Sequence, residues 1–141
     1  MKFRVKNLEE TKNLANNFAA KLKGGEVVLL SGDLGAGKTT FTQFVFACLG
    51  VKEVVSSPTF AILKSYQAKF KLHHFDVYRI STEEAIESGF DEIIYEPNSV
   101  KFIEWSENIA PLLPKQVIKI NIKYVNASER EFEIIDEKVD N

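Results

Sequence analysis

Residues 32–39 read Gly-Asp-Leu-Gly-Ala-Gly-Lys-Thr, which satisfies the pattern Gly-x4-Gly-Lys-Ser/Thr. The apolar run Val-Val-Leu-Leu at 27–30 predicts a strand over 26–31, directly before this pattern, that is buried on both faces of a parallel sheet. After the pattern, apolar side chains recur at helical spacing and predict a helix from near Gly37 to Gly50. A strand, a glycine-rich loop and a helix in this order are typical of a phosphate-binding loop.

The residue types of this loop suit phosphate binding. Glycines let backbone N–H groups turn inward, and the N-terminus of the helix adds a partial positive charge. We expect Lys38 to meet the β- and γ-phosphates of a nucleotide, and the Thr39 hydroxyl to bind the Mg²⁺ that bridges them. A glycine-rich turn with an incidental lysine is the alternative. The predicted nucleotide-binding residues of the loop are Asp33, Leu34, Gly35, Ala36, Gly37, Lys38, Thr39 and Thr40.

Composition indicates one soluble globular domain over residues 1–141, with 45% hydrophobic and 27% charged residues. No run approaches the roughly 18 uninterrupted apolar residues of a membrane helix, and the first residues turn polar, so we expect a cytoplasmic protein without a membrane partner. The net charge of −2 argues against DNA and direct RNA binding. Cys48 occupies an apolar helical position and is expected in the core.

The remaining pattern predicts an α/β fold of the P-loop NTPase type. Its three layers would hold a mixed, mainly parallel central sheet with antiparallel hairpins. The first helix would begin at the capping pair Asn7 and Glu10 and end at Gly24. The other expected elements are a hairpin over 60–66 and 71–79, helices over 82–88 and 107–113, a buried strand over 100–104 and a C-terminal hairpin about 126–128.

Two acids are candidates for the catalytic and metal-binding chemistry beside Lys38. Glu104 ends an apolar strand, where a phosphate-loop enzyme places an acid near Mg²⁺; a solvated strand-end carboxylate is the alternative. Asp76 shares one face of its strand with His74 and Tyr78, which suits an acid that positions water or the metal, or else a solvated hairpin face. Thr59 offers a hydroxyl that could sense the γ-phosphate, although an ordinary Ser/Pro turn is equally compatible.

The sequence also limits the kind of enzyme. Arginine occurs only at positions 4, 79 and 130, so few side chains could stabilise a transferred phosphate, and we expect slow turnover completed by partners. No guanine-reading Asn-Lys-x-Asp segment occurs, which favours ATP over GTP. A small phosphotransferase acting on a metabolite is the alternative, although no substrate domain is evident, and a nucleotide sensor is a third possibility. The lysines at 64, 69 and 71 are expected to be solvated rather than to contact tRNA.

Five segments together resemble the bacterial ATPase family of tRNA threonylcarbamoyladenosine biosynthesis, known as TsaE and earlier as YjeE. The pair His-x-Asp-x-Tyr-Arg and Glu-Trp-x-Glu is far more specific than the phosphate loop alone. The resemblance rests on Gly32–Phe41, Ser57–Phe60, His74–Arg79, Glu87–Glu92 and Ile103–Glu107.

The resemblance implies an ATPase that uses ATP and Mg²⁺. Thr39 and Glu104 would bind Mg²⁺, Thr59 would belong to a switch-like loop, Asp76 would be needed for hydrolysis, and Trp105 would lie near the nucleotide. Members of the family work with the TsaB and TsaD proteins, which attach threonylcarbamoyl to adenosine 37 of tRNAs that read codons beginning with A. This chain would reach tRNA only through that complex, and would drive or reset it rather than perform the transfer.

Overall fold

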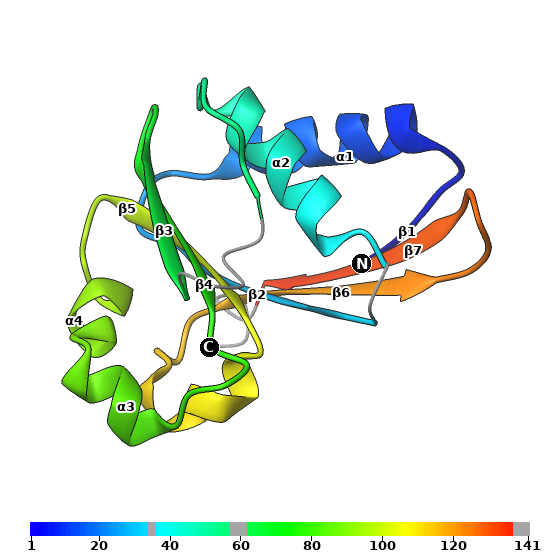
Figure 1. Ribbon diagram of the computed structural model, residues 1–141. Coiled ribbons are helices and arrows are strands. Elements are labelled where there is room, and N and C mark those ends of the chain that lie inside the picture. Colours follow the sequence, from blue (N-terminus) through cyan, green and yellow to red (C-terminus); the bar gives the residue numbers. More distant parts are fainter. Residues whose placement is uncertain (34–35, 57–61, 137–141) are drawn as a thin grey trace.

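The computed structural model describes residues 1–33, 36–56 and 62–136 (Figure 1). Leu34 and Gly35 of the predicted nucleotide site lie outside the described residues, as does the predicted switch residue Thr59.

The centre of the fold is one seven-stranded sheet with the order β1-β7-β6-β2-β5-β4-β3. Its middle is parallel, because β2 pairs with both β5 and β6 and β4 pairs with β5. Its edges are antiparallel, through β3–β4 on one side and β6–β7–β1 on the other. The mixed sheet and both hairpins are confirmed. The strands are β1 (Lys2–Val5), β2 (Val27–Gly32), β3 (Leu63–Gln67), β4 (Lys71–Asp76), β5 (Ser99–Glu104), β6 (Ile118–Tyr124) and β7 (Arg130–Asp136).

Helices cover the two faces of this sheet to different extents (Figure 1). The helices α1 (Leu8–Lys21) and α2 (Lys38–Cys48) pack together on one face. On the other face lie α3 (Thr82–Glu87), α4 (Phe90–Ile94) and the 3-10 helix η1 (Ser106–Leu112). No helix in the described part of the chain is long and apolar enough to span a bilayer.

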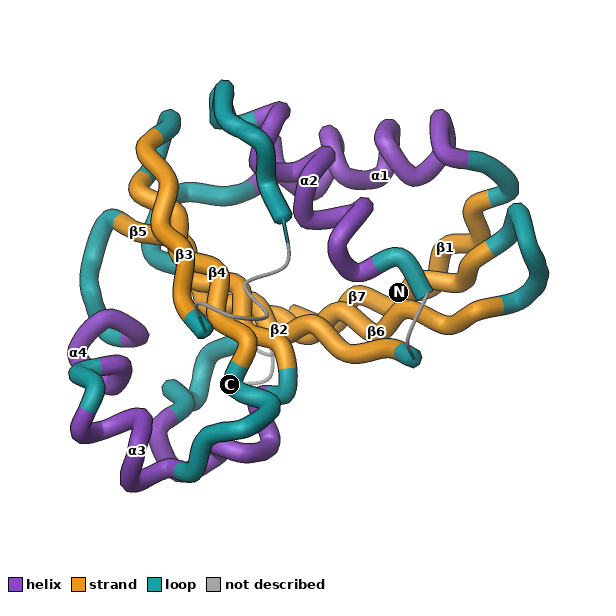
Figure 2. Tube along the Cα trace, viewed as in Figure 1, coloured by secondary structure: helices purple, strands orange, loops and turns teal. Residues whose placement is uncertain are grey.

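The second helical layer covers only half of its face, on the side of β3, β4 and β5 (Figure 2). Over that half, Phe75 and Ile103 are fully buried in one of the two apolar clusters. Over β1, β7 and β6, the same face carries polar side chains, among which Lys2, Lys119 and Lys123 are exposed. Alternating side chains on an antiparallel pair produce this pattern when one face meets water.

Local sequence signals explain where the helices begin. The Asn7 side chain accepts a hydrogen bond from the Glu10 backbone N–H at 2.9 Å, as predicted for the start of α1. The Glu10 carboxylate accepts from the backbone N–H of Lys6 at 2.8 Å, one residue before the position that a capping box uses. The short strand β1 and the short helix α4 were not predicted, because four or five residues carry too little periodicity.

Two expectations about burial are wrong, those for Cys48 and Lys64, and one alternative, for His74, is excluded. Cys48 is exposed, because α2 turns Phe41, Val45 and Phe46 into the core and leaves Cys48 on its flank. The alternative of a solvated hairpin face does not hold for His74, which is fully buried on the interior strand β4, between β3 and β5. Lys64 is half-buried, and its ammonium group donates a hydrogen bond to Ser56 Oγ at 2.6 Å.

Candidate nucleotide-binding site

The phosphate-loop segment leaves the sheet at the carboxyl end of β2. Gly32 has a φ of 156°, and a Cβ at this position would lie 2.6 Å from the backbone oxygen of Ile122. Gly37, with a φ of 104°, precedes the first residue of α2. Both glycines therefore meet requirements that other residues satisfy poorly. Because the first N–H groups of an α-helix have no partner within the helix, the start of α2 can offer such groups to an anion.

Lys38 and Glu104 lie together at this end of the sheet. Glu104 is the last residue of β5 and pairs in register with Leu30 of β2. Its Oε1 is 3.8 Å from Lys38 Nζ, and the two side chains are only 6% and 16% exposed. The structure thus brings together two of the three predicted catalytic residues, and Glu104 is not a solvated strand-end carboxylate.

Two aromatic residues border the same site. The Lys38 ammonium lies 5.6 Å from the centroid of the Trp105 ring, a distance at which a cation is attracted to the ring face. The Tyr78 ring lies 4.6 Å from that of Trp105, and both side chains remain exposed. Trp105 has a φ of 63°, so the chain turns sharply directly after Glu104. Trp105 therefore lies beside the Lys38 side chain, and its proximity to a bound nucleotide stays a prediction.

Asp76 and His74 lie on the neighbouring strand β4, and of the two only His74 contacts Glu104 through its side chain. Asp76 pairs in register with Glu104, and its Oδ1 accepts a hydrogen bond from the Tyr78 backbone N–H at 3.1 Å. His74 Nε2 lies 2.7 Å from Glu104 Oε2, inside the core. The sequence placed His74 next to Asp76 but missed its contact with Glu104, since only the register of β4 against β5 reveals that contact.

The oxygen atoms at this site suit Mg²⁺ shared with phosphates better than a metal ion bound by protein side chains alone. In the described residues, no group of three or more histidine, cysteine, aspartate or glutamate side chains could hold a metal ion. Mg²⁺ is usually bound by one or two protein oxygens together with phosphates and water. Thr39, in the first turn of α2, and the buried carboxylate of Glu104 provide such hard oxygen atoms.

A cavity of about 470 Å³ adjoins the loop on the side away from β5. Arg130 forms part of its wall and donates a hydrogen bond from Nε to the backbone oxygen of Ala36 at 3.1 Å. Its guanidinium also lies 4.6 Å from the centroid of the Tyr124 ring. Sequence reasoning noted Arg130 only as one of three arginines, because nothing local connects the β6–β7 turn to the loop. The cavity is lined by Asn7, Leu8, Thr11, Ala36, Gly37, Thr40, Ala127, Ser128, Arg130 and Phe132.

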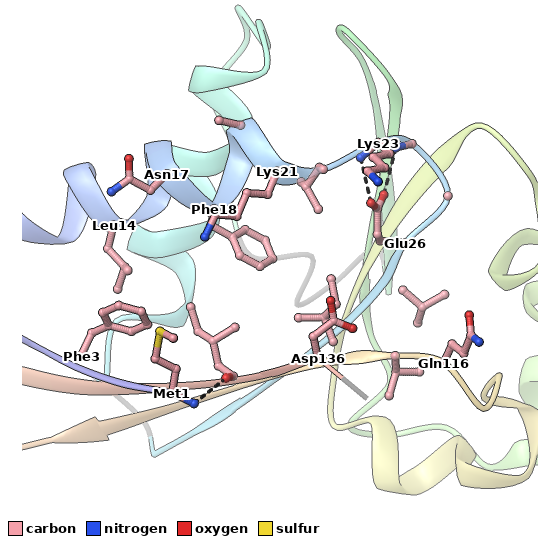
Figure 3. Close-up of a pocket in the computed structure, with 18 residues that line it drawn as sticks. Met1, Phe3, Leu14, Asn17, Phe18, Lys21, Lys23, Glu26, Gln116 and Asp136 are labelled. Carbon is pink, nitrogen blue, oxygen red and sulfur yellow. Dashed lines mark hydrogen bonds between the residues drawn. The ribbon is translucent and has the colours of Figure 1, made fainter. Parts of the chain in front are cut away.

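A larger cavity, about 900 Å³, lies at the opposite end of the sheet (Figure 3). Its wall combines apolar residues of α1, such as Leu14 and Phe18, with the first residues of β2 and β6. Its polar groups include the Glu26 carboxylate, which already accepts hydrogen bonds from the backbone N–H groups of Lys23 and Gly24. The predicted site residues are at the other end of the strands, so size alone does not make this cavity the functional site.

Comparison with known proteins assigns the family. The family model "Threonylcarbamoyl adenosine biosynthesis protein TsaE" matches residues 5–132. The chain is 43% identical over 132 residues to the tRNA threonylcarbamoyladenosine biosynthesis protein TsaE of Bacillus subtilis, covering 93% of this chain and 82% of that protein. It is also 43% identical over 125 residues to the protein of that name from Rickettsia prowazekii, covering 86% and 85%.

A solved structure supports the same assignment. The crystal structure of YdiB from Bacillus subtilis superposes with a TM-score of 0.81 at 39% sequence identity, over 96% of this chain and 84% of that one. The two chains therefore share the fold as well as the sequence pattern, including the mixed sheet described above. The chain belongs to the TsaE family of proteins involved in tRNA threonylcarbamoyladenosine biosynthesis.

Proposed function

We propose that the chain is a Mg²⁺-dependent ATPase that supports the TsaB and TsaD proteins in threonylcarbamoylation of adenosine 37, in tRNAs that read codons beginning with A. It does not perform the transfer, and it meets tRNA only through its partners. The observation that carries the proposal is the placement of Lys38 beside the buried Glu104, at the start of α2. That arrangement offers a cation and an N-terminal helix dipole to phosphates, with a carboxylate for the metal.

The cavity beside the loop supports binding of a whole nucleotide rather than phosphate alone. A nucleotide with its phosphates at the N-terminus of α2 would extend its nucleoside past Gly37 and Thr40, which line the cavity. Thr11, Ser128 and Arg130 supply polar groups on the remaining walls, and Phe132 supplies an apolar surface. A cleft with mainly apolar walls and a few polar groups is the common form of a small-molecule site.

Nucleotide binding is tested by replacing the loop lysine. We expect Lys38→Ala to abolish binding of ATP with Mg²⁺ in a calorimetric titration, while the thermal denaturation midpoint stays close to that of the wild type. Lys12→Ala, which removes an exposed lysine from α1, is the matched control and should bind as the wild type does. Unchanged affinity in Lys38→Ala would refute the assignment of the phosphate site.

Hydrolysis is tested with the partner proteins present. We expect phosphate release from ATP to rise on addition of TsaB and TsaD, and to fall in Glu104→Ala and Asp76→Ala. Phosphate should appear free in water; its transfer to a small-molecule acceptor would instead identify a kinase. A rate that responds neither to the partners nor to these substitutions would contradict the proposal, and tight binding without turnover would indicate a sensor.

A further inference from the structure

His74 contacts the proposed metal-binding carboxylate from inside the core. Its Nε2 lies 2.7 Å from Glu104 Oε2, and the imidazole is fully buried. We infer that His74 is a positioning residue: it fixes the rotamer of Glu104 so that Oε1 faces the phosphate loop and the metal. This inference rests on the proposed function, because it assigns a role within the same site.

The two carboxylate oxygens of Glu104 face different neighbours. Oε2 points to His74, whereas Oε1 lies 3.8 Å from Lys38 Nζ at the start of α2. A carboxylate held at one oxygen loses rotational freedom before a ligand arrives. Oε1 would therefore be the oxygen available to bound Mg²⁺ or to its water, and the hydrogen bond at Oε2 selects that orientation.

The surroundings of the imidazole indicate which nitrogen donates. Nδ1 is buried and has no hydrogen-bond partner among the described residues, and the ring meets the Phe46 ring at an interplanar angle of 78°. A proton on Nδ1 would be a buried donor without an acceptor, which costs free energy. The tautomer with its proton on Nε2 avoids this cost and makes His74 the donor to Glu104.

The adjacent residue His73 shows that burial alone does not create this role. It occupies the same strand and is 3% exposed, but it points to the opposite face of the sheet, where it contacts Ser65 and Glu96. A substitution at His73 therefore perturbs the same strand without touching Glu104. This makes His73 the matched control for His74.

The test measures metal affinity rather than hydrolysis. Mn²⁺, as a spectroscopic substitute for Mg²⁺, is titrated by electron paramagnetic resonance into protein saturated with a non-hydrolysable ATP analogue. Loss of a hydrogen-bonding partner of a metal-binding carboxylate typically weakens metal binding about 10- to 100-fold. We expect that loss in His74→Met, recovery in His74→Gln, whose amide reaches the position of Nε2, and wild-type affinity in His73→Met.

A double-mutant cycle shows whether His74 acts through Glu104. In Glu104→Gln, His74→Met should weaken Mn²⁺ binding no further. Equal losses in both backgrounds, or equal losses in His74→Met and His73→Met, would overturn the inference. Should His74→Met fail to fold, His74→Asn replaces it. The shorter asparagine amide does not reach Glu104 Oε2, so His74→Asn should bind Mn²⁺ more weakly than His74→Gln. Equal affinities of these two variants would also overturn the inference. If the wild type binds no nucleotide, the proposed function fails; if it binds and His74→Met matches it, only the positioning role fails.

Discussion

β4 carries two adjacent histidines, and each faces a glutamate on a different side of the sheet. His74 and Glu104 are 2.7 Å apart on the side of α1 and α2, where Glu104 is 6% exposed. His73 and Glu96 are 3.1 Å apart on the other side, where Glu96 is 34% exposed. The two pairs have the same chemistry, and their different neighbours give them different roles.

Neighbouring groups distinguish the pairs. Glu104 ends a parallel strand directly beside Lys38, so its charge is available to a ligand at the phosphate loop. Glu96 follows α4, and its backbone oxygen accepts a hydrogen bond from the buried ammonium of Lys101 at 2.8 Å. The Glu104 pair therefore belongs to the candidate site, whereas the Glu96 pair connects the loop before β5 to the sheet.

The rate of ATP hydrolysis should show the largest difference between substitutions at Glu104 and at Glu96. Glu104→Gln removes the charge next to the metal position, and metal-assisted stabilisation of transition-state charge is a term of several kcal/mol. We expect a loss of about 100-fold or more in the rate with TsaB and TsaD present, roughly 3 kcal/mol in the activation barrier. Glu96→Gln should hydrolyse ATP at the wild-type rate. A comparable loss in both variants would contradict the conclusion that Glu104, and not Glu96, belongs to the candidate site.

The free energy of unfolding should depend on the face of the sheet that carries Glu96, where the Lys101 side chain is buried. Lys101 Nζ donates to the backbone oxygens of Glu96 and Ser99, and burial lowers the pKa of its ammonium group. Lys101→Met leaves those oxygens with fewer donors, and we expect chemical denaturation to show a loss of about 1–3 kcal/mol. Lys123→Met, an exposed lysine on β6, is the control and should change stability by no more than about 0.5 kcal/mol.

Nucleotide affinity completes this test. Because Lys101 faces away from the phosphate loop, Lys101→Met should bind ATP with wild-type affinity at a temperature where it remains folded. Weaker binding in this variant, without loss of structure, would show that the two faces of the sheet are coupled.

The sequence predicted those parts of the fold that depend on local patterns. The strand before Gly32, the helix after Gly37 and both hairpins follow from short-range periodicity and glycine positions. Glu104 was placed near the loop by a topological rule, because acids at the carboxyl ends of neighbouring parallel strands converge. The structure places it there.

The sequence could not predict features that depend on strand neighbours. Alternation assigned His74 to a polar face, but it gives no information on whether a strand is interior, and β4 is covered on both faces. Helical spacing grouped Cys48 with Phe41 and Val45, but the buried face of α2 is rotated toward Phe46, which leaves Cys48 exposed. The contact of Arg130 with the loop joins residues 94 positions apart, which no local pattern reports.

Lowering the pH should reduce the stabilisation that the contact between His73 and Glu96 provides. The hydrogen bond from His73 lowers the pKa of the Glu96 carboxyl below its ordinary value of 4.5, and the charges of His73 and Lys71 act in the same direction. A lowered folded-state pKa means that the unfolded chain binds the proton more readily, so the stabilisation is present above about pH 4.5 and is lost as the pH falls through the folded-state pKa. We therefore expect the difference in denaturation midpoint between wild type and Glu96→Gln to shrink as the pH is lowered through this range.

The same titration in His73→Met identifies the source of that pH dependence. With the imidazole removed, the largest cause of the lowered Glu96 pKa is gone, so Glu96→Gln should have little pH-dependent effect in this background. A difference in midpoint that is constant with pH, or that persists without His73, would show that the contact on the far side of β4 contributes no charge-dependent stability. The contrast with Glu104 would then rest on geometry alone.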